Sequence, residues 1–182
     1  MVIPNHFLTP PISEEYIFQS NVTRNQTPDL VNIRKKILVG MYFYVKGDLK
    51  SLDLTDEWNT FFSNTKYIDQ KSKPKQYYQI QYWLDNQVEE GLYFFIGIEV
   101  TSMEDVSPQF VIKTIPEGTY LKFIHKGLSS NVGFTYRYIY NEFLPDSSYK
   151  LSKPFNFECF GEGYFSPHME KSESTILIPI DK

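Results

Sequence analysis

The sequence predicts an α+β fold made of two pseudo-symmetric βαββ repeats that form antiparallel sheets with a central ligand groove. Segments of alternating β-branched and aromatic residues predict strands, and two segments carry apolar residues at helical spacing. Lys46-Gly47 and Lys126-Gly127 stand 80 residues apart, and each precedes a predicted helix. Because the order strand, Lys-Gly turn, helix and hairpin occurs twice, order and spacing indicate an internal repeat. The junction of two such halves is a natural ligand site.

The first repeat is expected over about residues 29–101. It follows an N-terminal arm or irregular lead-in, residues 1–28, which is rich in proline and shows no sustained period. The predicted elements are one strand or a broken pair at 30–33 and 36–45, a helix over about 52–65, and a hairpin of strands at 76–84 and 92–101.

The second repeat is expected over about residues 110–182. Pro116-Glu117-Gly118 predicts a turn between its first two strands, and Pro145 is expected to end its helix. The predicted elements are strands at 110–115 and 119–125, a helix over about 132–143, and strands at 155–160 and 175–180.

Composition excludes several classes of function. The net charge is −4, and the longest basic cluster is Arg34-Lys35-Lys36, so we expect no direct nucleic-acid partner. The single cysteine, Cys159, excludes an internal disulfide or a thiolate metal cluster and favours a reducing, cytoplasmic location. No apolar run approaches about 18 residues, so we expect no membrane span, and neither a signal peptide nor a glycine-rich phosphate loop is seen, so we expect no cofactor. His6 and His168 lie in irregular segments with no acid–histidine spacing that suggests ligation, so we expect no metal.

The lead candidate for a functional residue is Glu158. In a strand over 154–160, Asn156, Glu158 and Phe160 share one side, and Phe155, Phe157 and Cys159 share the other. A carboxylate among aromatic residues lies either on a solvated face or against an apolar cavity, where burial favours a cationic partner or a raised pKa.

Six further residues are candidates for the ligand site, although ordinary packing or a solvated face explains each of them as well. Aromatic side chains suit both a core and a ligand-lining wall, and a second acid lies in a hydrophobic strand. These candidates are Trp58, Tyr93, Tyr136, Tyr140, Phe160 and Glu99.

Several motifs resemble those of the GyrI-like small-molecule-binding family. Residues 91–100 resemble its glycine-and-valine strand, and Trp58 matches the tryptophan of its first helix. Phe157-Glu158 followed by Phe160 is similar to its "fE-Y" motif, with phenylalanine in place of the usual tyrosine. Further similar segments are 115–120 with 125–127, the helix exit at 143–145 and the closing strand at 176–180, so that the resemblance covers about residues 29–182.

The resemblance implies two βαββ repeats around a central groove. The family includes effector-binding domains of multidrug-sensing transcription activators and stand-alone gyrase-inhibitory proteins, and this chain resembles the stand-alone type. In the drug-sensing members the acid of the "fE" motif faces lipophilic cations stacked among aromatic residues, and Glu158 occupies that position.

Three functions remain open at this point. The leading hypothesis is the binding of hydrophobic, cationic or planar small molecules in an aromatic groove, with Glu158 as the anionic anchor. The second is a hydrolase of reactive xenobiotics that uses Glu158 as its catalytic residue, although the sequence offers no clear second catalytic partner. The third is a protein-interaction role, such as inhibition of a topoisomerase, as the resemblance implies for the gyrase-inhibitory members.

Overall fold

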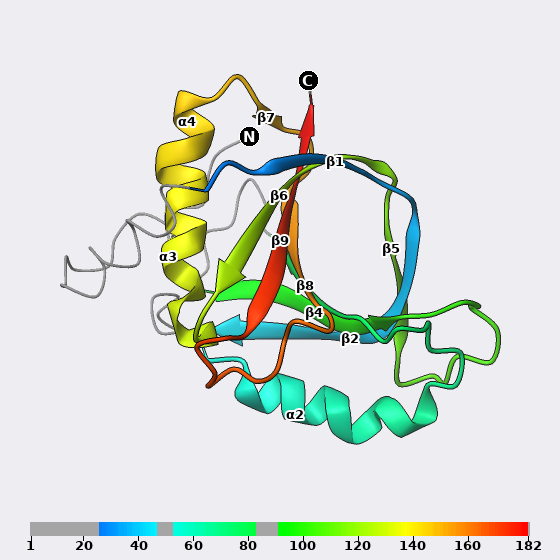
Figure 1. Cartoon of the computed structure of the whole chain (residues 1–182). Coiled ribbons are helices and arrows are strands. Elements are labelled where there is room, and N and C mark those ends of the chain that lie inside the picture. The colour runs from blue at the N-terminus through cyan, green and yellow to red at the C-terminus, as the bar shows by residue number, and fades with distance from the viewer. Residues whose placement is uncertain (1–25, 47–52, 83–90, 182) are drawn as a thin grey trace.

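The computed structural model describes residues 26–46, 53–82 and 91–181. Nine strands in these regions pair antiparallel in one curled sheet, with the order β1-β6-β9-β8-β3-β4-β2-β5 and β7 paired to β9 (Figure 1). Along the chain the elements are β1 (Asp29–Ile33), β2 (Lys36–Lys46), α2 (Thr55–Asn64), η3 (Thr65–Tyr67), β3 (Tyr77–Tyr82), β4 (Gly91–Glu99), β5 (Val111–Ile115), β6 (Gly118–Lys126), η4 (Ser129–Asn131), α3 (Val132–Arg137), η5 (Tyr138–Phe143), α4 (Leu144–Asp146), β7 (Lys150–Leu151), β8 (Phe155–Phe160) and β9 (Glu173–Asp181).

The two predicted βαββ repeats are confirmed. The first is β2-α2-β3-β4, and the second is β6, the helical segment from η4 to α4, β8 and β9. The halves join where β3 pairs with β8, from Tyr77 opposite Phe160 to Tyr82 opposite Phe155. One continuous sheet therefore runs through both repeats, and its centre is this junction.

A long bent ribbon links the outer edges of the two halves. The segments β1-β2 and β5-β6 are both broken pairs, with bends at Arg34-Lys35 and at Pro116-Glu117. β1 pairs with β6 of the second half, and β5 pairs with β2 of the first half. Each repeat is therefore completed by a strand that leads into the other one. Residues 1–25 of the expected N-terminal arm lie outside the described residues.

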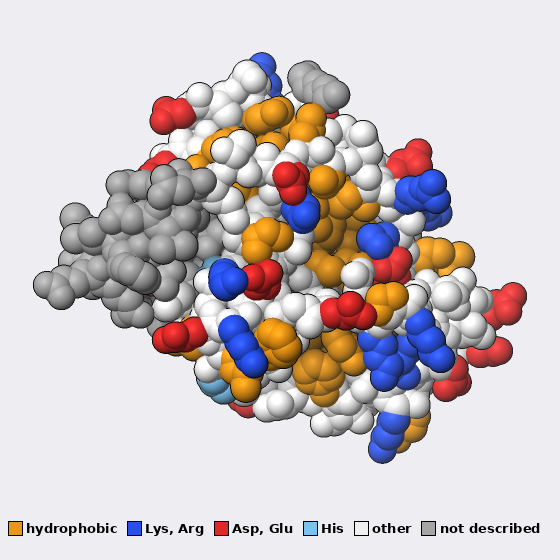
Figure 2. Space-filling view, in the orientation of Figure 1, with side chains coloured by type: hydrophobic (Ala, Val, Ile, Leu, Met, Phe, Trp, Pro, Cys, Tyr) orange, Lys and Arg blue, Asp and Glu red, His pale blue; other side chains and the backbone are white. Residues whose placement is uncertain are grey.

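The sheet has an outer face covered by helices and an inner face enclosed by its own curl (Figure 1). On the outer face, one buried cluster lies under α2 and a second lies under α3 and η5. A third cluster lies on the inner face, and Figure 2, in the same orientation, shows hydrophobic side chains in the middle of the molecule. Alternation along each strand decides which cluster a residue joins. Inner-face members include Tyr78, Phe95, Tyr120, Phe157 and Leu177.

The first helix is anchored by a side chain just before it. The carboxylate of Asp53 accepts hydrogen bonds from the backbone N–H and the hydroxyl of Thr55, at 2.9 and 2.6 Å. Such a bond satisfies one of the donors that an α-helix leaves free at its start. Of the apolar residues at helical spacing in this helix, Phe61 is fully buried in the cluster against the sheet, whereas Phe62 is 46% exposed.

The second helical segment is less regular than the sequence predicts. It opens with the 3₁₀ turn η4, passes through α3, widens to the π-helical turn η5, and continues through Pro145 to Asp146. Pro145 is the second residue of α4, which directly follows the π-helical turn, so the segment ends one residue after the proline and not at it. No helix among the described residues is long and apolar enough to cross a membrane.

Candidate ligand-binding site

Glu158 lies at the junction of the two repeats. It is in the middle of β8, opposite Gln79 of β3 on one side and Ile176 of β9 on the other. Its side chain is on the outer face, between the clusters under the two helical segments, and only 4% of the residue is exposed. The repeat geometry therefore places a carboxylate at the centre of the molecule, where water has little access.

Few polar groups contact this carboxylate. The hydroxyl of Ser174 on β9 donates a hydrogen bond to Oε1 of Glu158. Asn156, two residues earlier on the same face, donates from Nδ2 to the hydroxyl of Tyr140 at 3.0 Å. Asn156 is fully buried, and its Oδ1 has no hydrogen-bond partner. The Glu158 carboxylate and the Asn156 amide oxygen, two acceptors on the outer face of β8, thus have few hydrogen-bond donors among the described residues.

Burial raises the pKa of the Glu158 carboxyl to about 7, and the hydrogen bond from Ser174 offsets part of this rise. Removing a carboxylate from water disfavours its charged form unless a cation or several donors replace the water. The ion pairs among the described residues involve Glu99, Asp29 and Glu173, and none involves Glu158. Near neutral pH, Glu158 is therefore poised between its acid and carboxylate forms.

Aromatic rings from three segments gather around Glu158. The indole N–H of Trp58 in α2 donates a hydrogen bond to Gln79 Oε1 at 3.0 Å. Gln79 is the residue that lies opposite Glu158 in the sheet. The ring of Phe160 packs edge-on against Trp58, with ring centroids 5.3 Å apart. Tyr164, from the loop between β8 and β9, packs on Phe160 at 4.7 Å. These three residues, Trp58, Phe160 and Tyr164, are called the aromatic cover below.

The second helical segment supplies two stacked tyrosines on the other side. Tyr136 and Tyr140 lie with ring planes 16° apart and centroids 6.5 Å apart, and both are buried. Burial raises the pKa of each phenol, and the charge of Glu158 raises that of Tyr136 further. The structure thus places five of the candidate residues near one another: Glu158, Phe160, Trp58, Tyr136 and Tyr140.

Tyr93 and Glu99, the other two candidates, lie on the inner face of the sheet and do not join this group. Tyr93 pairs with Tyr44 and Tyr82, and 43% of its surface is exposed. Because side chains alternate along a strand, Tyr93 and Glu99 share one face of β4, but the sequence could not show that Glu158 lies on the opposite face of the sheet.

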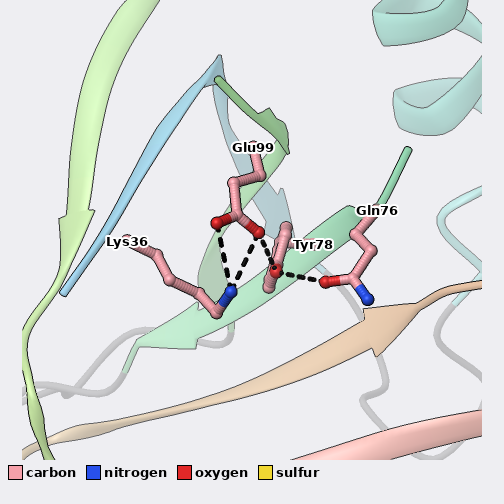
Figure 3. Close-up of polar contacts among 4 residues, drawn as sticks. All are labelled: Lys36, Gln76, Tyr78 and Glu99. Carbon is pink, nitrogen blue, oxygen red and sulfur yellow. Dashed lines mark hydrogen bonds and ion pairs between the residues drawn. The ribbon is translucent and has the colours of Figure 1, made fainter. Parts of the chain in front are cut away.

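Glu99 belongs to a separate polar cluster (Figure 3). Lys36 Nζ donates to both of its carboxylate oxygens, at 3.1 and 2.9 Å, and the Tyr78 hydroxyl donates to Oε2 at 2.7 Å. The amide oxygen of Gln76 lies 2.9 Å from the same hydroxyl. Lys36 thus neutralises the charge of Glu99, whereas none of the ion pairs among the described residues involves Glu158.

Three residues of the Glu158 site were not among the sequence candidates. Ser174 lies one residue before the predicted start of its strand at 175, so its place on the outer face could not be predicted. Gln79 alternates with buried residues in β3, and only the β3–β8 pairing places it beside Glu158. Tyr164 lies in an irregular loop, where no periodicity indicates direction. Among the described residues no group of three or more His, Cys, Asp or Glu side chains could hold a metal ion.

Solved structures with this architecture include several bacterial proteins. A structure of SAV2435 bound to tetraphenylphosphonium matches with a TM-score of 0.68 and 12% identity, over 86% of this chain and 94% of that one. The C-terminal domain of EcmrR matches with a TM-score of 0.66 and 18% identity, over 86% and 98%. An integron cassette protein of Vibrio cholerae matches with a TM-score of 0.61 and 14% identity, over 86% and 97%. At these identities the likeness shows the fold.

Among curated proteins, N-acetyl-gamma-glutamyl-phosphate reductase of Campylobacter jejuni is 34% identical over 65 residues. The aligned part is 35% of this chain and 19% of the reductase, so nothing about the reductase activity follows for this chain. The model of the GyrI-like small molecule binding domain, by contrast, matches residues 26–181, both repeats included. The chain therefore belongs to the GyrI-like family of small-molecule-binding domains.

Proposed function

We propose that this domain binds hydrophobic cations between α2 and the second helical segment, with Glu158 as the anionic anchor. The observation that carries the proposal is a buried carboxylate that no cation among the described residues pairs with, beside the buried Oδ1 of Asn156, which has no hydrogen-bond partner there either. Burying a charge or an acceptor without a partner is costly, so an entering cation lowers the free energy of the site. A neutral ligand of the same shape would gain less.

The surrounding rings supply the hydrophobic part of such a site. A cation against the face of a tryptophan or tyrosine ring gains about 0.5–2 kcal/mol per contact. Trp58, Tyr136 and Tyr164 all lie around Glu158, from different segments of the chain. SAV2435, which shares the fold, was solved with tetraphenylphosphonium, a cation with four apolar rings, and this supports the choice of ligand class.

Ligand entry requires the aromatic cover to move. Glu158 is 4% exposed and Phe160 is 9% exposed in the ligand-free structure. Tyr164 is held by a hydrogen bond between its hydroxyl and that of Ser129, at 2.9 Å. Because Trp58 packs directly on Phe160, we expect ligand entry to change the environment of the indole and hence its fluorescence.

The test is a titration with tetraphenylphosphonium followed by tryptophan fluorescence at pH 8. We expect Glu158→Gln to weaken binding at least tenfold, which corresponds to about 1.4 kcal/mol. Glu99→Gln is the matched control, because it removes one acid from the opposite face of the same sheet, and we expect its affinity to equal that of the wild type. Equal affinities of the wild type and Glu158→Gln would overturn the anchor role.

A hydrolase activity at the same residue is a second candidate, and the raised pKa of Glu158 is the observation that favours it. A carboxylate with a pKa near 7 is basic enough to take a proton from water that attacks an electrophilic ligand. The test is turnover of activated phenyl esters by the wild type and by Glu158→Gln. Turnover that is lost in the variant supports a hydrolase, and tight binding without turnover rejects it.

A further inference from the structure

In the part of the chain that the structure describes, no cationic side chain pairs with Glu158. Its hydrogen-bond partner is the hydroxyl of Ser174, a neutral group. Within the described ranges, burial raises its pKa, the hydrogen bond from Ser174 lowers it, and no cation contributes. Lys36, Lys122 and Lys126 form ion pairs with other acids. A second source of neutralising charge is therefore needed whenever the carboxyl is ionised.

The titratable groups that face Glu158 from the neighbouring elements do not supply that charge. On β6, His125 lies opposite Ser174, and burial lowers its pKa, so it is neutral near pH 7. Its ring nitrogens contact the Thr135 hydroxyl at 2.9 Å and the Leu128 carbonyl oxygen at 3.1 Å. α2 contributes the indole of Trp58, which does not titrate, and β3 contributes the phenol of Tyr77. The remaining facing groups are phenols whose pKa burial raises: Tyr136, Tyr140 and Tyr164.

We propose that Glu158 carries a proton in the ligand-free protein at acidic pH and that a bound cation displaces it, so that binding at acidic pH releases one proton. The inference rests on the function proposed above and adds a regulation of the same site. The O–H bond of the carboxyl breaks, its electron pair stays on the carboxylate that faces the cation, and the proton passes to buffer. Ser174 donates to Oε1, so Oε2 carries the proton, and the serine bond persists in both states.

This exchange makes affinity depend on pH in one direction. Below the pKa of about 7, protons and cations compete for Glu158, and the affinity for a permanent cation falls about tenfold for each pH unit. Above that value the carboxylate is already free of its proton, and the affinity becomes constant. We expect binding of tetraphenylphosphonium to be about thirtyfold weaker at pH 5.5 than at pH 8.5.

The experiment is isothermal titration calorimetry of the full chain with tetraphenylphosphonium at pH 5.5, 7.0 and 8.5. Each titration is run in two buffers that differ in ionisation enthalpy, because the difference in heat counts the protons released. We expect about one proton per cation at pH 5.5, about half a proton at pH 7.0 and almost none at pH 8.5.

Two controls separate the exchange from general effects of pH. Glu158→Gln should release no proton and show one affinity at all three values, whereas Glu99→Gln should behave like the wild type. Triphenylphosphine oxide, a neutral compound with three of the same rings, should bind the wild type without proton release. Binding of the cation with constant affinity and no proton release overturns this inference alone. Absence of binding at every pH overturns the proposed function as well.

Discussion

The buried carboxyl of Glu158 lowers the stability of the folded protein when it is ionised. Its pKa of about 7 compares with 4.5 for an exposed glutamate, a difference worth about 3 kcal/mol. Because the folded state binds the proton more tightly than the unfolded chain, this group destabilises the fold as pH rises from about 4.5 to about 7. Above pH 7 the full cost is present, and below pH 4.5 it vanishes.

Glu158→Gln should therefore stabilise the ligand-free protein more at pH 8 than at pH 5. We expect the difference in the free energy of unfolding between variant and wild type to grow by about 2 kcal/mol across this interval. Urea denaturation at both pH values measures it. If the free energy of unfolding of the variant differs from that of the wild type by the same amount at pH 5 and at pH 8, the carboxyl titrates as an exposed group does.

The Lys36–Glu99 pair, in contrast to Glu158, stabilises the folded protein, because Lys36 neutralises the Glu99 carboxylate within the fold. Lys36→Met should leave a half-buried carboxylate with only the Tyr78 hydroxyl as a partner, and we expect a loss of about 1–2 kcal/mol. Chemical denaturation measures the loss, and the double variant Lys36→Met/Glu99→Leu should recover much of it. Affinity for tetraphenylphosphonium should not change, since the cluster lies on the inner face. A loss of affinity in Lys36→Met would contradict the assignment of the two acids to separate roles.

At the scale of elements, the sequence predicted the strands and the first helix well because their side chains alternate or repeat with one period. The second helical segment was harder, since a π-helical turn shifts the residues that follow it. Trp58 and Tyr138 each lie 11 residues past the glycine of their Lys-Gly pair, Gly47 and Gly127. Trp58 nevertheless contacts Gln79 beside Glu158, whereas the Tyr138 hydroxyl donates to the Gln26 backbone oxygen. Equal spacing in sequence did not give equal surroundings.

The pairing of β2 with β4 depends on a close approach of their backbones at Gly40 and Gly97. A Cβ atom at Gly40 would lie 2.1 Å from the Ile96 backbone oxygen, so the strands would have to separate. We expect Gly40→Ala to destabilise the protein by about 3 kcal/mol or more, as measured by thermal unfolding.

Gly133 in α3 provides the matched control for this change. A Cβ atom there has nothing within 4 Å, and alanine favours a helix by about 1 kcal/mol over glycine. Gly133→Ala should therefore raise the melting temperature slightly. If both substitutions lower stability alike, the tight contact at Gly40 is not what constrains the sheet.

At the scale of the whole molecule, the two repeats are joined in three places. β3 pairs with β8, β1 with β6, and β5 with β2, so neither repeat has a complete sheet of its own. We expect one cooperative unfolding transition for both halves. Phe123→Ala, in the core of the second half, should lower the protection of β4 and β9 amides together in hydrogen exchange. Loss of protection in β9 alone would show that the halves unfold independently.

The site lies where β3 of the first repeat pairs with β8 of the second. The sequence could predict the local alternation within β8 but not this pairing. Alternation placed Asn156, Glu158 and Phe160 on one face, and the family resemblance indicated that this face lines the groove. Tyr93 and Glu99 could not be assigned to a face relative to Glu158, because that requires the register of β3 against both β4 and β8. Such long-range pairing is decided by tertiary packing rather than by local pattern.

The most direct test of the central claim is a crystal structure of the protein with tetraphenylphosphonium. We predict that the cation lies on the outer face between α2 and the second helical segment, against the Glu158 carboxylate, with the aromatic cover displaced. A cation bound on the inner face, at Glu99 or along Tyr44 and Tyr93, with Glu158 still covered, would contradict the account.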